Sequence, residues 1–592
     1  MRQIYRLGIG LSALLLASAA PSLAQTFTHV QTVSPATTTS GSNVLEIVTD
    51  AAGNSYVTGF FAGTVTIGGT SLTSVGGNDV FVAKYDAAGV AQWAVRGGGT
   101  GDDIATAIAL DASGNVGITG SYGGGAPATF GNTLLGNAGG QDMFVAKLSN
   151  GGAWQWAQRM SGASTELGQS LAFDSNGNLY VVGYYQSSGV SLSGTSSTYS
   201  NFNAPLAASL LLKYAPGGSY LGARNLTSNS SCYANALAID ASDNLYLYGD
   251  FSGSATLGGT TLSSLGGQDL FVARLTPALA FTWATSGGGI YDDFAPSGRS
   301  LAVEANGNTY LTGRSYSYTV AFGNNFISNN NTNGDAFIIG LNGGGGWRWG
   351  QRAGGPDQDR GEAVALDGKG NLYATGDFAG TADFGRFSLT SAGGADAYVA
   401  KLTTAGAYLS AIQAGGPLDD GGGGVASDVT GNLYHVGYYS SSPASFGPYN
   451  LLNMGTQTGY FARSLADLTV STPGQASGGI YNNVTIASGG STTLGSFLVA
   501  NGSLVVQPGG SLNLGCQPLT GAGNFQLLAG GALYICNPLG IARSGPVARC
   551  KSPASALSTP MRSTFITVRR PRLRVMPCRA RCGRSRRSMR TA

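Results

Sequence analysis

Between residues 27 and 465 the apolar residues fall in short runs separated by Gly, Ser, Asn and Asp. Beyond the N-terminus no window repeats its apolar residues every 3.6 positions, so the runs predict β-strands rather than helices. Residues 104–110 are apolar at both sets of alternate positions, as expected of a strand packed on both faces. Further strands are predicted at residues 116–121, 143–148 and 154–160. One unit is therefore a four-stranded antiparallel sheet.

A Gly-Asn pair recurs at the turn between the first two strands of each unit. In residues 111–115, Asp111 can accept hydrogen bonds from the turn backbone, and Gly114 can take the positive φ that a β-carbon forbids. The pair stands at residues 53–54, 114–115, 177–178, 243–244 (Asp in place of Gly), 307–308, 370–371 and 431–432, at intervals of 61, 63, 66, 64, 63 and 61 residues. A fixed period predicts stacked units, none of which can bury its apolar face alone.

A second phrase, Gly-Gly-x-Asp-x-Phe-Val-Ala-Lys, keeps the same period on the third strand. It stands at residues 76–84, 139–147, 266–274 and 393–401, with weaker versions at 211–213, 335–340 and 459–463. Seven four-stranded units predict an all-β fold, a seven-bladed β-propeller. The period exceeds the roughly 40–45 residues of a WD-type blade, and we expect the surplus in a Gly/Ser/Thr-rich loop between the second and third strands. A β-solenoid, the competing architecture, uses shorter repeats and needs no special N-terminus.

The two ends of the repeat region complement each other. Six units end in a fourth strand, whereas the seventh stops after its third strand near Leu465. The fourth strands are marked by Trp93, Trp156, Trp283 and Trp349, or by weaker counterparts near Leu221 and Ser410. The missing strand is predicted at residues 27–33. Pairing the two ends would complete the last blade and remove an exposed sheet edge, so we expect ring closure by this N-terminal strand.

The N-terminal segment indicates export. Residues 1–24 are predicted to be a signal peptide, since Arg2 and Arg6 precede an apolar run at 7–20 and a small-residue cleavage site. That run is too short to predict a membrane span, and no later segment is predicted to form one. The propeller is predicted over residues 25–465. We therefore expect a protein that is secreted or held at the outer cell surface.

Residues 466–541 are predicted to form a small, Gly-rich, solenoid-like β module. Three similar runs follow one another there at intervals of 20 and 21 residues, each followed by a second alternating apolar stretch. Cys516 and Cys536 fall at matching places in consecutive repeats. A disulfide between them and a pair of inert thiols are the two open interpretations.

The last part, residues 542–592, is an Arg-rich tail without apolar periodicity. From Arg543 onward it holds 13 Arg, one Lys and no acidic residue. It could bind nucleic acid or an anionic surface, but we favour a shifted reading frame, because the tail interrupts a repeat.

Without the tail and the signal peptide, the chain has 16 basic and 29 acidic residues, a net charge of about −13. Such an acidic body predicts neither nucleic acid nor an anionic membrane as partner.

These motifs resemble the seven-bladed β-propeller repeat (SBBP) family of secreted and surface-associated bacterial proteins. The family phrase, which runs from Gly-Gly-x-Asp-x-Phe-Val-Ala-Lys-Leu through Trp, Gly-Gly and Asp-Asp to Ala-Ile-Ala-Leu-Asp-x-x-Gly-Asn-x-Tyr-Val-Thr-Gly, is met almost whole by residues 76–120 and with losses by 266–313. The resemblance covers residues 26–465. Units three and seven depart most, because residues 209–213 lack the Gly-Gly-x-Asp lead and 455–463 lack its Asp. The resemblance implies architecture far more than activity.

The sequence contains no recognisable catalytic motif. Of its two histidines, His29 lies in the closing strand and His435 in a second strand, and neither has neighbours that suggest a triad or a metal cluster. There is no Gly-x-Ser-x-Gly in a strand–turn–helix context, no His-Glu-x-x-His, and no Cys-x-x-Cys flanked by ligands. We therefore predict a protein that is not an enzyme and carries no organic cofactor.

The acidic residues gather in the loops that leave the fourth strands. Five of the seven units carry them: Asp102 and Asp103; Glu166; Asp292 and Asp293; Asp357, Asp359 and Glu362; Asp419 and Asp420. Loops that enter first strands share one rim of a propeller, so we expect these carboxylates to converge on one face around the axis. The candidate ligand-binding residues are Asp102, Asp103, Asp292, Asp293, Asp357, Asp359, Asp419 and Asp420. Clustered hard oxygens suit Ca²⁺, so the same rim is the candidate Ca²⁺ site.

The acids recur with the repeat, which favours turn capping and a soluble rim, since a catalytic pair should be singular. Binding of Ca²⁺ or carbohydrate and glycoside acid–base chemistry remain the alternatives. Tyrosines near the ends of second strands, among them Tyr316 and Tyr318, could stack on sugars or pack between blades. The polar insert 186–204 makes unit three the most individual surface and a candidate contact site.

Together these features predict a secreted or cell-surface, non-enzymatic recognition or structural module. We expect it to be a monomer and to bind an extracellular protein or glycan. The alternatives are an extracellular enzyme that acts on polysaccharide through the rim carboxylates, and a Ca²⁺-stabilised scaffold.

Overall fold

The computed structural model describes residues 27–534, apart from 330–331, 467, 471–472, 477–478, 495–497, 502, 515–518, 521–523 and 529–531. The predicted signal peptide, the Arg-rich tail, Cys516 and Cys536 lie outside the described residues. Every named element is a β-strand. In this described part, no helix has the length and apolar character needed to cross a membrane.

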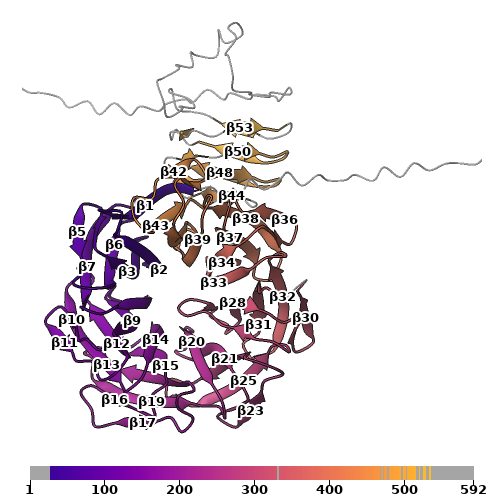
Figure 1. Ribbon diagram of the computed structural model, residues 1–592. Helices are drawn as coiled ribbons and strands as arrows, with labels where there is room; N and C mark the ends of the chain where they lie inside the picture. Colours follow the sequence, from indigo (N-terminus) through magenta and orange to yellow (C-terminus); the bar gives the residue numbers. More distant parts are fainter. Residues whose placement is uncertain are drawn as a thin grey trace, which may run out of the picture.

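Seven antiparallel sheets stand around a central axis, which confirms the predicted seven-bladed propeller (Figure 1). Within a blade the strands run from the first, beside the axis, to the fourth, at the outer edge. Blades one to four are β2 (Gly41–Thr49), β3 (Ser55–Ala62), β6 (Asp79–Tyr85), β7 (Ala91–Gly99); β8 (Ile104–Leu110), β9 (Val116–Gly123), β12 (Gln141–Leu148), β13 (Trp154–Ser161); β14 (Glu166–Phe173), β15 (Leu179–Tyr185), β18 (Ala208–Tyr214), β19 (Tyr220–Leu226); and β20 (Cys232–Ile239), β21 (Leu245–Phe251), β24 (Asp269–Leu275), β25 (Phe281–Gly287). Blades five to seven are β26 (Asp293–Phe294) with β27 (Leu301–Val303), β28 (Thr309–Ser315), β31 (Asp335–Leu341), β32 (Trp347–Ala353); β33 (Asp359–Leu366), β34 (Asn371–Phe378), β37 (Asp396–Thr403), β38 (Tyr408–Ala414); and β39 (Asp420–Ser427), β40 (Leu433–Tyr439), β43 (Thr458–Ser464), β1 (Phe27–Pro35).

The predicted Asp and Gly chemistry shapes the turns between first and second strands. Asp50 Oδ1 accepts the backbone N–H groups of Ala52 and Asn54, both at 2.9 Å, and Gly53 has a φ of 81°. In blade four, where Asp replaces Gly, Asp243 itself takes a φ of 61°. The turn geometry is thus kept even where the residue type is less favourable.

Neighbouring blades are joined by an apolar core and by the tryptophans of the fourth strands. Trp93 of blade one donates its indole N–H to the carbonyl oxygen of Asn150 in blade two, at 3.0 Å. Its ring also covers Gly152, where an added β-carbon would lie 2.8 Å from the indole. Gly at this turn therefore leaves room for the Trp of the preceding blade, which explains why both residues recur together.

We predicted a loop between the second and third strands of each unit. That prediction is wrong, because a β-hairpin takes up most of this segment. The seven hairpins are β4 (Thr64–Ile67) and β5 (Thr70–Thr73), β10 (Ala128–Phe130) and β11 (Thr133–Leu135), β16 (Gly189–Leu192) and β17 (Thr198–Ser200), β22 (Ser254–Leu257) and β23 (Thr260–Ser263), β29 (Thr319–Phe322) and β30 (Asn325–Ser328), β35 (Thr381–Phe384) and β36 (Phe387–Thr390), and β41 (Ala444–Phe446) and β42 (Tyr449–Leu451). Three of them, at β4, β10 and β16, also pair with the fourth strand of the preceding blade. The hairpins therefore cover outer edges that would otherwise be open.

The N-terminal strand closes the ring, as predicted. β1 pairs antiparallel with β43, from Phe27 opposite Ser464 to Val33 opposite Gly459. Pro35 and Ser34 then pair with β4 of blade one. His29 lies opposite Arg463, at the position that Trp93 holds opposite Lys84 in blade one. The closing strand is therefore a true fourth strand that comes from the other end of the chain.

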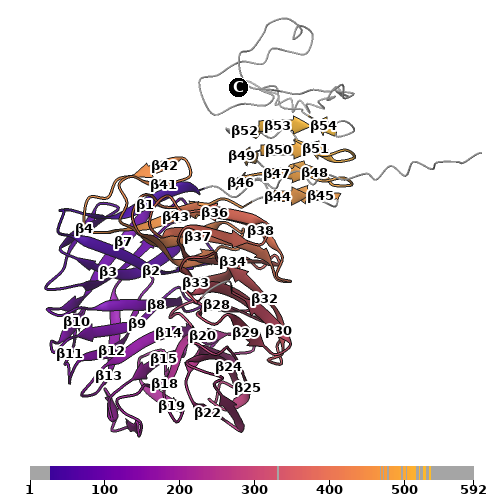
Figure 2. The ribbon, with the colours of Figure 1, turned by 45° about the vertical axis from the view of Figure 1, so that its right-hand side comes forward.

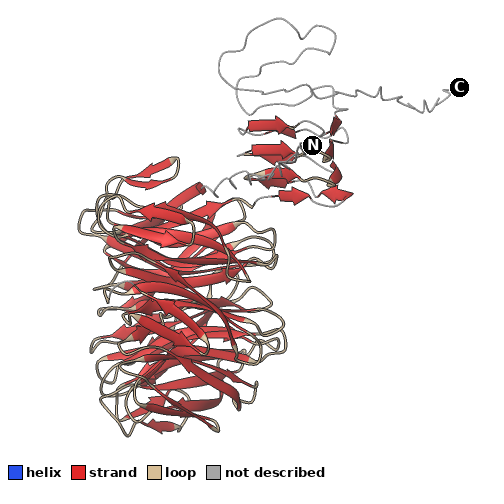
Figure 3. Cartoon of the chain, turned by 90° about the vertical axis from the view of Figure 1, so that its right-hand side faces the viewer, coloured by secondary structure: helices blue, strands red, loops and turns tan. Residues whose placement is uncertain are grey.

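Small parallel sheets follow blade seven, as the repeats predicted (Figures 2 and 3). Their strands are β44 (Leu468–Val470), β47 (Val484–Ile486), β50 (Ser503–Val506), β53 (Asn524–Leu527); β45 (Pro473–Ala476), β48 (Ser491–Leu494), β51 (Ser511–Asn513), β54 (Ala532–Tyr534); and β46 (Gly479–Tyr481), β49 (Leu498–Ala500), β52 (Leu519–Thr520). Equivalent residues stack in register, as Val484 does on Leu504, around a buried apolar core. The module is therefore a three-sided β-solenoid.

Candidate functional site

The first carboxylate of a rim pair holds the loop before a neighbouring third strand. Asp102, Asp292 and Asp419 are exposed. Their Oδ1 atoms accept one backbone N–H each, from Asn78 at 2.9 Å, from Gln268 at 2.9 Å and from Ala395 at 3.0 Å respectively. Asp357 is exposed as well. One oxygen of each of the three bound carboxylates is thus occupied by the protein's own backbone.

The second carboxyl group of each pair is buried at the start of a first strand. It accepts the backbone N–H of the residue four positions earlier: Gly99 for Asp103 (2.6 Å), Gly289 for Asp293 (2.8 Å), Gly355 for Asp359 (2.7 Å) and Gly416 for Asp420 (2.6 Å). This bond ties the end of one blade to the start of the next. These four acids are therefore framework residues with no exposed carboxylate to offer a ligand.

Each buried carboxyl group faces a second one, the Asp of the Gly-Gly-x-Asp phrase. A β-carbon placed on Gly98 would lie 2.6 Å from Oδ2 of Asp103 and 3.0 Å from Oδ1 of Asp79, so both carboxyl groups converge on this glycine. The pairs are Asp79 with Asp103, Asp142 with Glu166, Asp269 with Asp293, Asp335 with Asp359, and Asp396 with Asp420. Five blade junctions therefore hold a carboxyl pair.

The two junctions without a pair lack both acids. Strand register places Ala208 of blade three and Thr458 of blade seven at the Gly-Gly-x-Asp position. The facing positions are Cys232 in blade four and Ser42 in blade one. An acid thus occurs on both sides of a junction or on neither. We infer that the two carboxyl groups act as a unit.

At the junction of blades four and five, a shared proton accounts for the carboxyl pair, whereas at two other junctions an arginine lies beside the pair, Arg96 at Asp79 and Arg352 at Asp335. Burial, together with the charge of Asp269, raises the pKa of Asp293 to about 7. Burial likewise raises the pKa of Asp269 to about 6. Oδ1 of Asp269 is buried and accepts no hydrogen bond from the described residues. Two close carboxylates cannot both ionise without a large cost, so one proton between them is the stable arrangement near neutral pH.

The buried candidate acids stand at the starts of first strands and so share one rim, but each faces the acid of the adjoining blade within its own junction. Each pair lies in its own junction between two blades. Among the described residues, no group of three or more His, Cys, Asp or Glu side chains is placed to hold a metal ion. The buried carboxyl groups are surrounded by backbone N–H donors, which stabilise negative charge and cannot coordinate a cation.

We therefore expect a calcium chelator to leave the melting temperature unchanged within experimental error. The measurement is thermal unfolding by circular dichroism in chelator, with and without added CaCl₂, and with MgCl₂ as a control for ionic effects. A fall in chelator that Ca²⁺ reverses and Mg²⁺ does not would contradict this expectation and support the scaffold alternative.

One hollow on the rim departs from the repeat. It lies between blades four and five and has a volume of about 480 Å³. Its lining residues are Gly267, Ile290, Tyr291, Asp292, Tyr316 and Thr332. The ring of Tyr291 meets that of Tyr318 edge to face, 6.4 Å between centroids, and the two residues are 46% and 52% exposed. Exposed aromatic faces beside a carboxylate suit a sugar ring.

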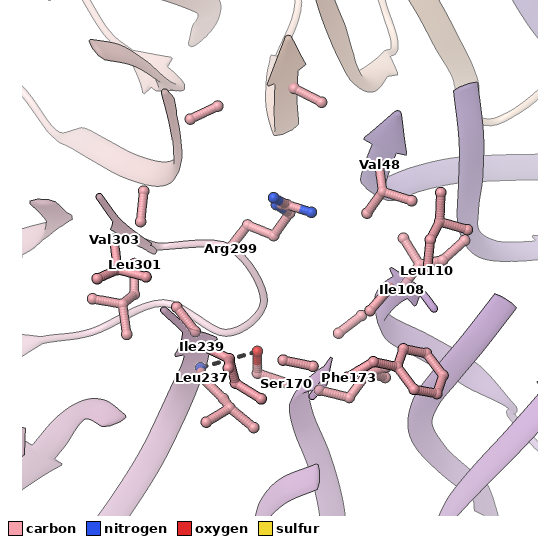
Figure 4. Close-up of a pocket in the computed structure, with 18 of the residues that line it drawn as sticks. Val48, Ile108, Leu110, Ser170, Phe173, Leu237, Ile239, Arg299, Leu301 and Val303 are labelled. Carbon is pink, nitrogen blue, oxygen red and sulfur yellow. Dashed lines mark hydrogen bonds between the residues drawn. The ribbon is translucent and has the colours of Figure 1, made fainter. Parts of the chain in front are cut away.

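A second cavity, of about 450 Å³, lies on the propeller axis. The first strands of all seven blades contribute to its wall, and Figure 4 shows the side chains around it. Its larger apolar side chains are Val48, Ile108, Leu110, Leu171, Phe173, Leu237, Ile239, Leu301, Val303 and Leu366. Among the lining residues, Arg299 alone is charged, and its guanidinium points into the space.

Arg299 reaches the axis because the first strand of blade five is interrupted. Residues 295–300, the blade-five insert, separate β26 from β27. Leu301 pairs with Leu311 as Ile108 pairs with Ile118 in blade two, but it stands three positions further from its buried acid. The extra residues cannot continue the strand and loop across the axis instead.

The insert is fixed by contacts to other blades. The backbone N–H of Gly298 donates to Gln169 O at 3.0 Å, and Ser170 Oγ donates to Gly298 O at 3.1 Å. Gly298 also forms a backbone bridge with Ala236 of blade four. A β-carbon on Gly298 would lie 2.5 Å from Oε2 of Glu46 in blade one. Blades one, three and four therefore hold the insert in place.

The buried side chain of Glu46 in blade one lies beside the insert. Its side chain is buried, which raises the pKa of Glu46 to about 8 against the opposing charge of Arg299. Backbone N–H groups of Ile47 and Arg299 also oppose that shift. Two titratable side chains of opposite sign therefore meet between blade one and the insert.

Sequence reasoning missed Arg299 and Glu46, although both leave a signal. Residues 293–303 align with 103–110 only if three residues are inserted. At the position of Glu46 most other blades carry small residues: Ala107, Ser170, Ala236, Ala363 and Gly424. Deviation from the repeat, rather than the repeat itself, marks this site.

A family model described as beta-propeller repeat (SBBP) matches residues 155–184. This match and the seven blades of the structure confirm the resemblance to that repeat. A WD repeat-containing protein of Acanthamoeba polyphaga mimivirus, described as uncharacterized, is 26% identical over 170 residues, which cover 24% of this chain and 12% of that protein. Regulatory protein FlaEY of Caulobacter vibrioides is 28% identical over 365 residues, 56% of this chain and 36% of that protein. The chain thus matches well under half the length of either relative.

Solved structures are similar in fold alone. The WD40 domain of Neurospora crassa Pan2 has a TM-score of 0.35 and 10% identity, and the match covers 71% of this chain and 88% of that domain. A protein of Dyadobacter fermentans has a TM-score of 0.33 and 10% identity, over 60% and 93% of the two chains. These values carry no argument about activity.

Proposed function

We propose that this protein is a secreted or cell-surface β-propeller that acts as a non-enzymatic recognition module, with a glycan as the ligand of the rim hollow. The observation that carries the proposal is the hollow itself. Its lining includes the exposed ring of Tyr291 and the exposed carboxylate of Asp292, and the exposed ring of Tyr318 packs edge to face on Tyr291 beside it. One oxygen of Asp292 accepts the N–H of Gln268, which fixes the side chain, and its other oxygen can accept sugar hydroxyl groups.

The placement of the titratable groups supports a role without catalysis. His435 is buried, its Nε2 lies 2.7 Å from the Thr375 hydroxyl, and burial lowers its pKa to about 3. His29 lies in the closing strand and packs over the turn at Gly89 of blade one. The buried acids recur in five junctions, whereas catalysis needs one accessible acid–base pair in reach of a substrate.

A protein partner is the second candidate, and one feature favours it. The predicted contact segment 186–204 contains β16 and β17 and ends in an open loop. Phe202 in this loop is 95% exposed, and Leu206 just after it is 43% exposed. A free phenylalanine ring on a polar surface is typical of a contact that a partner buries.

The test is glycan-array binding of the purified protein. We expect the signal to fall at least about tenfold in Tyr291→Ala/Tyr318→Ala, because each stacked ring contributes on the order of 1 kcal/mol. Leu418→Ala is the matched control, since Leu418 stands at the same rim position between blades six and seven and is 54% exposed. Equal loss in the control would reject the hollow as the site.

Two further measurements separate the alternatives. Turnover of any polysaccharide by the wild type would overturn the non-enzymatic assignment. A partner captured from extracellular proteins by the wild type and lost in Phe202→Ala, without any glycan signal, would favour the protein partner.

A further inference from the structure

The rim hollow between blades four and five carries a single charge in its lining, and that charge is negative. Of the six lining residues, Asp292 alone is charged. Its side chain is exposed, and none of the ion pairs formed among the described residues includes it. Binding sites and their ligands pair opposite charges, because like charges placed together cost free energy. The hollow therefore favours a ligand that carries positive charge.

The carboxylate of Asp292 is held in one place and keeps one oxygen for a ligand. Oδ1 accepts the backbone N–H of Gln268 at 2.9 Å. A β-carbon on Gly267 would lie 2.0 Å from the same oxygen, so glycine is what allows the backbone to approach the carboxylate this closely. Oδ2 has no hydrogen-bond donor among the described residues. A fixed acceptor loses little conformational entropy when a ligand binds to it.

The buried acids beside Asp292 do not offset its charge. Burial raises the pKa of Asp269, and the negative charge of Asp292 adds to that rise. At two other junctions an arginine pairs with the carboxyl group of the third strand. Among the described residues, no such pair is found at Asp269 or Asp293. This junction therefore keeps an excess of negative charge.

Arg314 lies close to the hollow but does not line it. Its guanidinium carbon is 5.6 Å from the ring centroid of Phe294 and 4.9 Å from that of Tyr316. It lines a separate hollow, together with Glu362. There the charge of Arg314 lowers the pKa of Glu362, against the larger rise that burial causes. Because a cation of the protein already lies over the ring of Tyr316, we assign the contacts of the ligand to Tyr291 and Asp292.

The pairing of a tyrosine with the rim acid is particular to this junction. The residues that precede the exposed rim acids at four junctions are Gly101, Tyr291, Pro356 and Leu418. The ring of Tyr291 is 46% exposed and packs edge to face on Tyr318, which holds it in place. The face of an aromatic ring attracts a cation. Tyr291 and Asp292 thus offer two complementary contacts to one ammonium group.

We propose that the glycan of the rim hollow is a cationic one, built from amino sugars whose amines are not acetylated. This inference rests on the proposed glycan-binding function and adds the charge of the ligand to it. The protonated amine donates a hydrogen bond to Oδ2 of Asp292, and the C–H face of the sugar ring packs on Tyr291. One sugar unit makes both contacts. A lysine side chain of a basic peptide offers the ammonium group but no ring face.

The experiment compares three β-1,4-linked tetrasaccharides, of glucosamine, N-acetylglucosamine and glucose. Their binding to the same purified protein as on the glycan array is measured by isothermal titration calorimetry at pH 6.5. We expect the glucosamine tetrasaccharide to bind at least about tenfold more tightly than the two neutral ones, because a hydrogen bond between charged groups is stronger than one between neutral groups. At pH 8.5, where the sugar amines are mostly neutral, this preference should disappear. Tetralysine, the peptide control, should bind more weakly than the glucosamine tetrasaccharide.

Two variants locate the cation. Asp292→Asn keeps an oxygen for the N–H of Gln268, so the loop is expected to stay intact. It should lower the affinity for the glucosamine tetrasaccharide to that of the neutral ones and leave the neutral ones unchanged. Asp419→Asn is the matched control, since Asp419 accepts one backbone N–H, from Ala395 at 3.0 Å, but follows Leu418 instead of a tyrosine. It should bind as the wild type does, and thermal unfolding shows that both variants fold.

The outcomes separate this inference from the proposed function. Equal affinity for the three tetrasaccharides, lost in Tyr291→Ala/Tyr318→Ala, would overturn the cationic ligand and leave the glycan-binding function standing. A preference for glucosamine that survives in Asp292→Asn would also overturn it, because the amine would then be bound elsewhere. Tetralysine that binds as tightly as the glucosamine tetrasaccharide would point to a basic peptide instead. If the wild type binds no glycan at all, the proposed function fails, and this inference fails with it.

Discussion

A chain that lacks residues 25–34 is expected to lose its single cooperative unfolding transition. The deletion removes nearly all of β1, and with it the outer strand of blade seven. Backbone hydrogen bonds contribute about 1 kcal/mol each, and burial of Phe27 and Val33 contributes about 1.5–3 kcal/mol each. Their sum is comparable to the whole stability of about 5–15 kcal/mol that native proteins have.

The loss should spread beyond blade seven. Ser34 and Pro35 of the same strand pair with β4, and Ser42 donates a hydrogen bond to Val33 O at 2.7 Å. Without β1, blade seven exposes the edge of β43, and the hairpin β4–β5 of blade one loses its pairing with blade seven. The measurement is thermal and denaturant unfolding, followed both by far-UV circular dichroism and by tryptophan fluorescence. Non-coincident transitions are the expected result.

A permuted chain provides the control. Because Phe27 lies opposite Ser464, a short turn after Ser464 can carry residues 27–35 directly into the same pairing with β43. This permutant should unfold cooperatively, since it keeps the closing strand and changes only the connection. If the deletion variant melts like the wild type, closure by β1 is not what holds the ring together.

The features that the sequence predicted are those written into every repeat. Short alternating runs and Asp/Gly turns specify strands locally, so blade number, strand order and ring closure could all be deduced. The hairpins between second and third strands escaped notice because their runs are three or four residues long. Their pairing with the preceding blade depends on the tertiary structure, which local alternation does not encode.

In the candidate site, too, the sequence predicted what recurs in the repeats and missed what depends on tertiary structure. The acids of the rim were found from their recurrence, yet their roles were set by burial, which a repeat pattern does not report. Asp292 and Asp293 are adjacent in sequence, but one is exposed and the other buried. The facing acid, Asp269, lies 24 residues away and joins Asp293 only through the packing of two blades. Arg299 depends on an irregularity of one blade, so a search for repeated motifs passes over it.

Acidification from pH 8 to pH 5 is expected to raise the melting temperature. Burial raises the pKa of nine carboxyl groups to between about 6 and 8: Glu46, Asp103, Glu166, Asp269, Asp293, Asp359, Glu362, Asp377 and Asp396. In this window the folded state binds more protons than the unfolded state, whose carboxyl groups titrate near pH 4. Stability therefore falls as pH rises through these values, and it rises on acidification.

Two kinds of residue, the histidines and the aspartates of the turns, oppose this trend without reversing it. Burial lowers the pKa of His435 to about 3 and also lowers that of His29, so unfolding takes up protons at these residues below about pH 6.5. Burial raises the pKa of Asp50 and Asp111, but hydrogen bonds within the turns outweigh burial and hold both pKa values below the usual range. The stability that these two aspartates contribute is lost only at lower pH. Nine raised carboxyl groups against two histidines decide the sign.

Asp293→Asn tests the link to the carboxyl pairs. The amide resembles the protonated acid, since it can donate to Asp269 while its oxygen accepts the N–H of Gly289, as Asp293 does at 2.8 Å. The variant should be more stable than the wild type at pH 8, where one pKa unit of relief corresponds to about 1.4 kcal/mol. The difference should vanish near pH 5. The control is Asp357→Asn, which removes the same charge from an exposed rim carboxylate at another junction and should leave the slope of the profile unchanged. Parallel profiles for wild type and Asp293→Asn would mean that no proton is held between the blades, because a group that titrates alike in both states cannot make stability depend on pH.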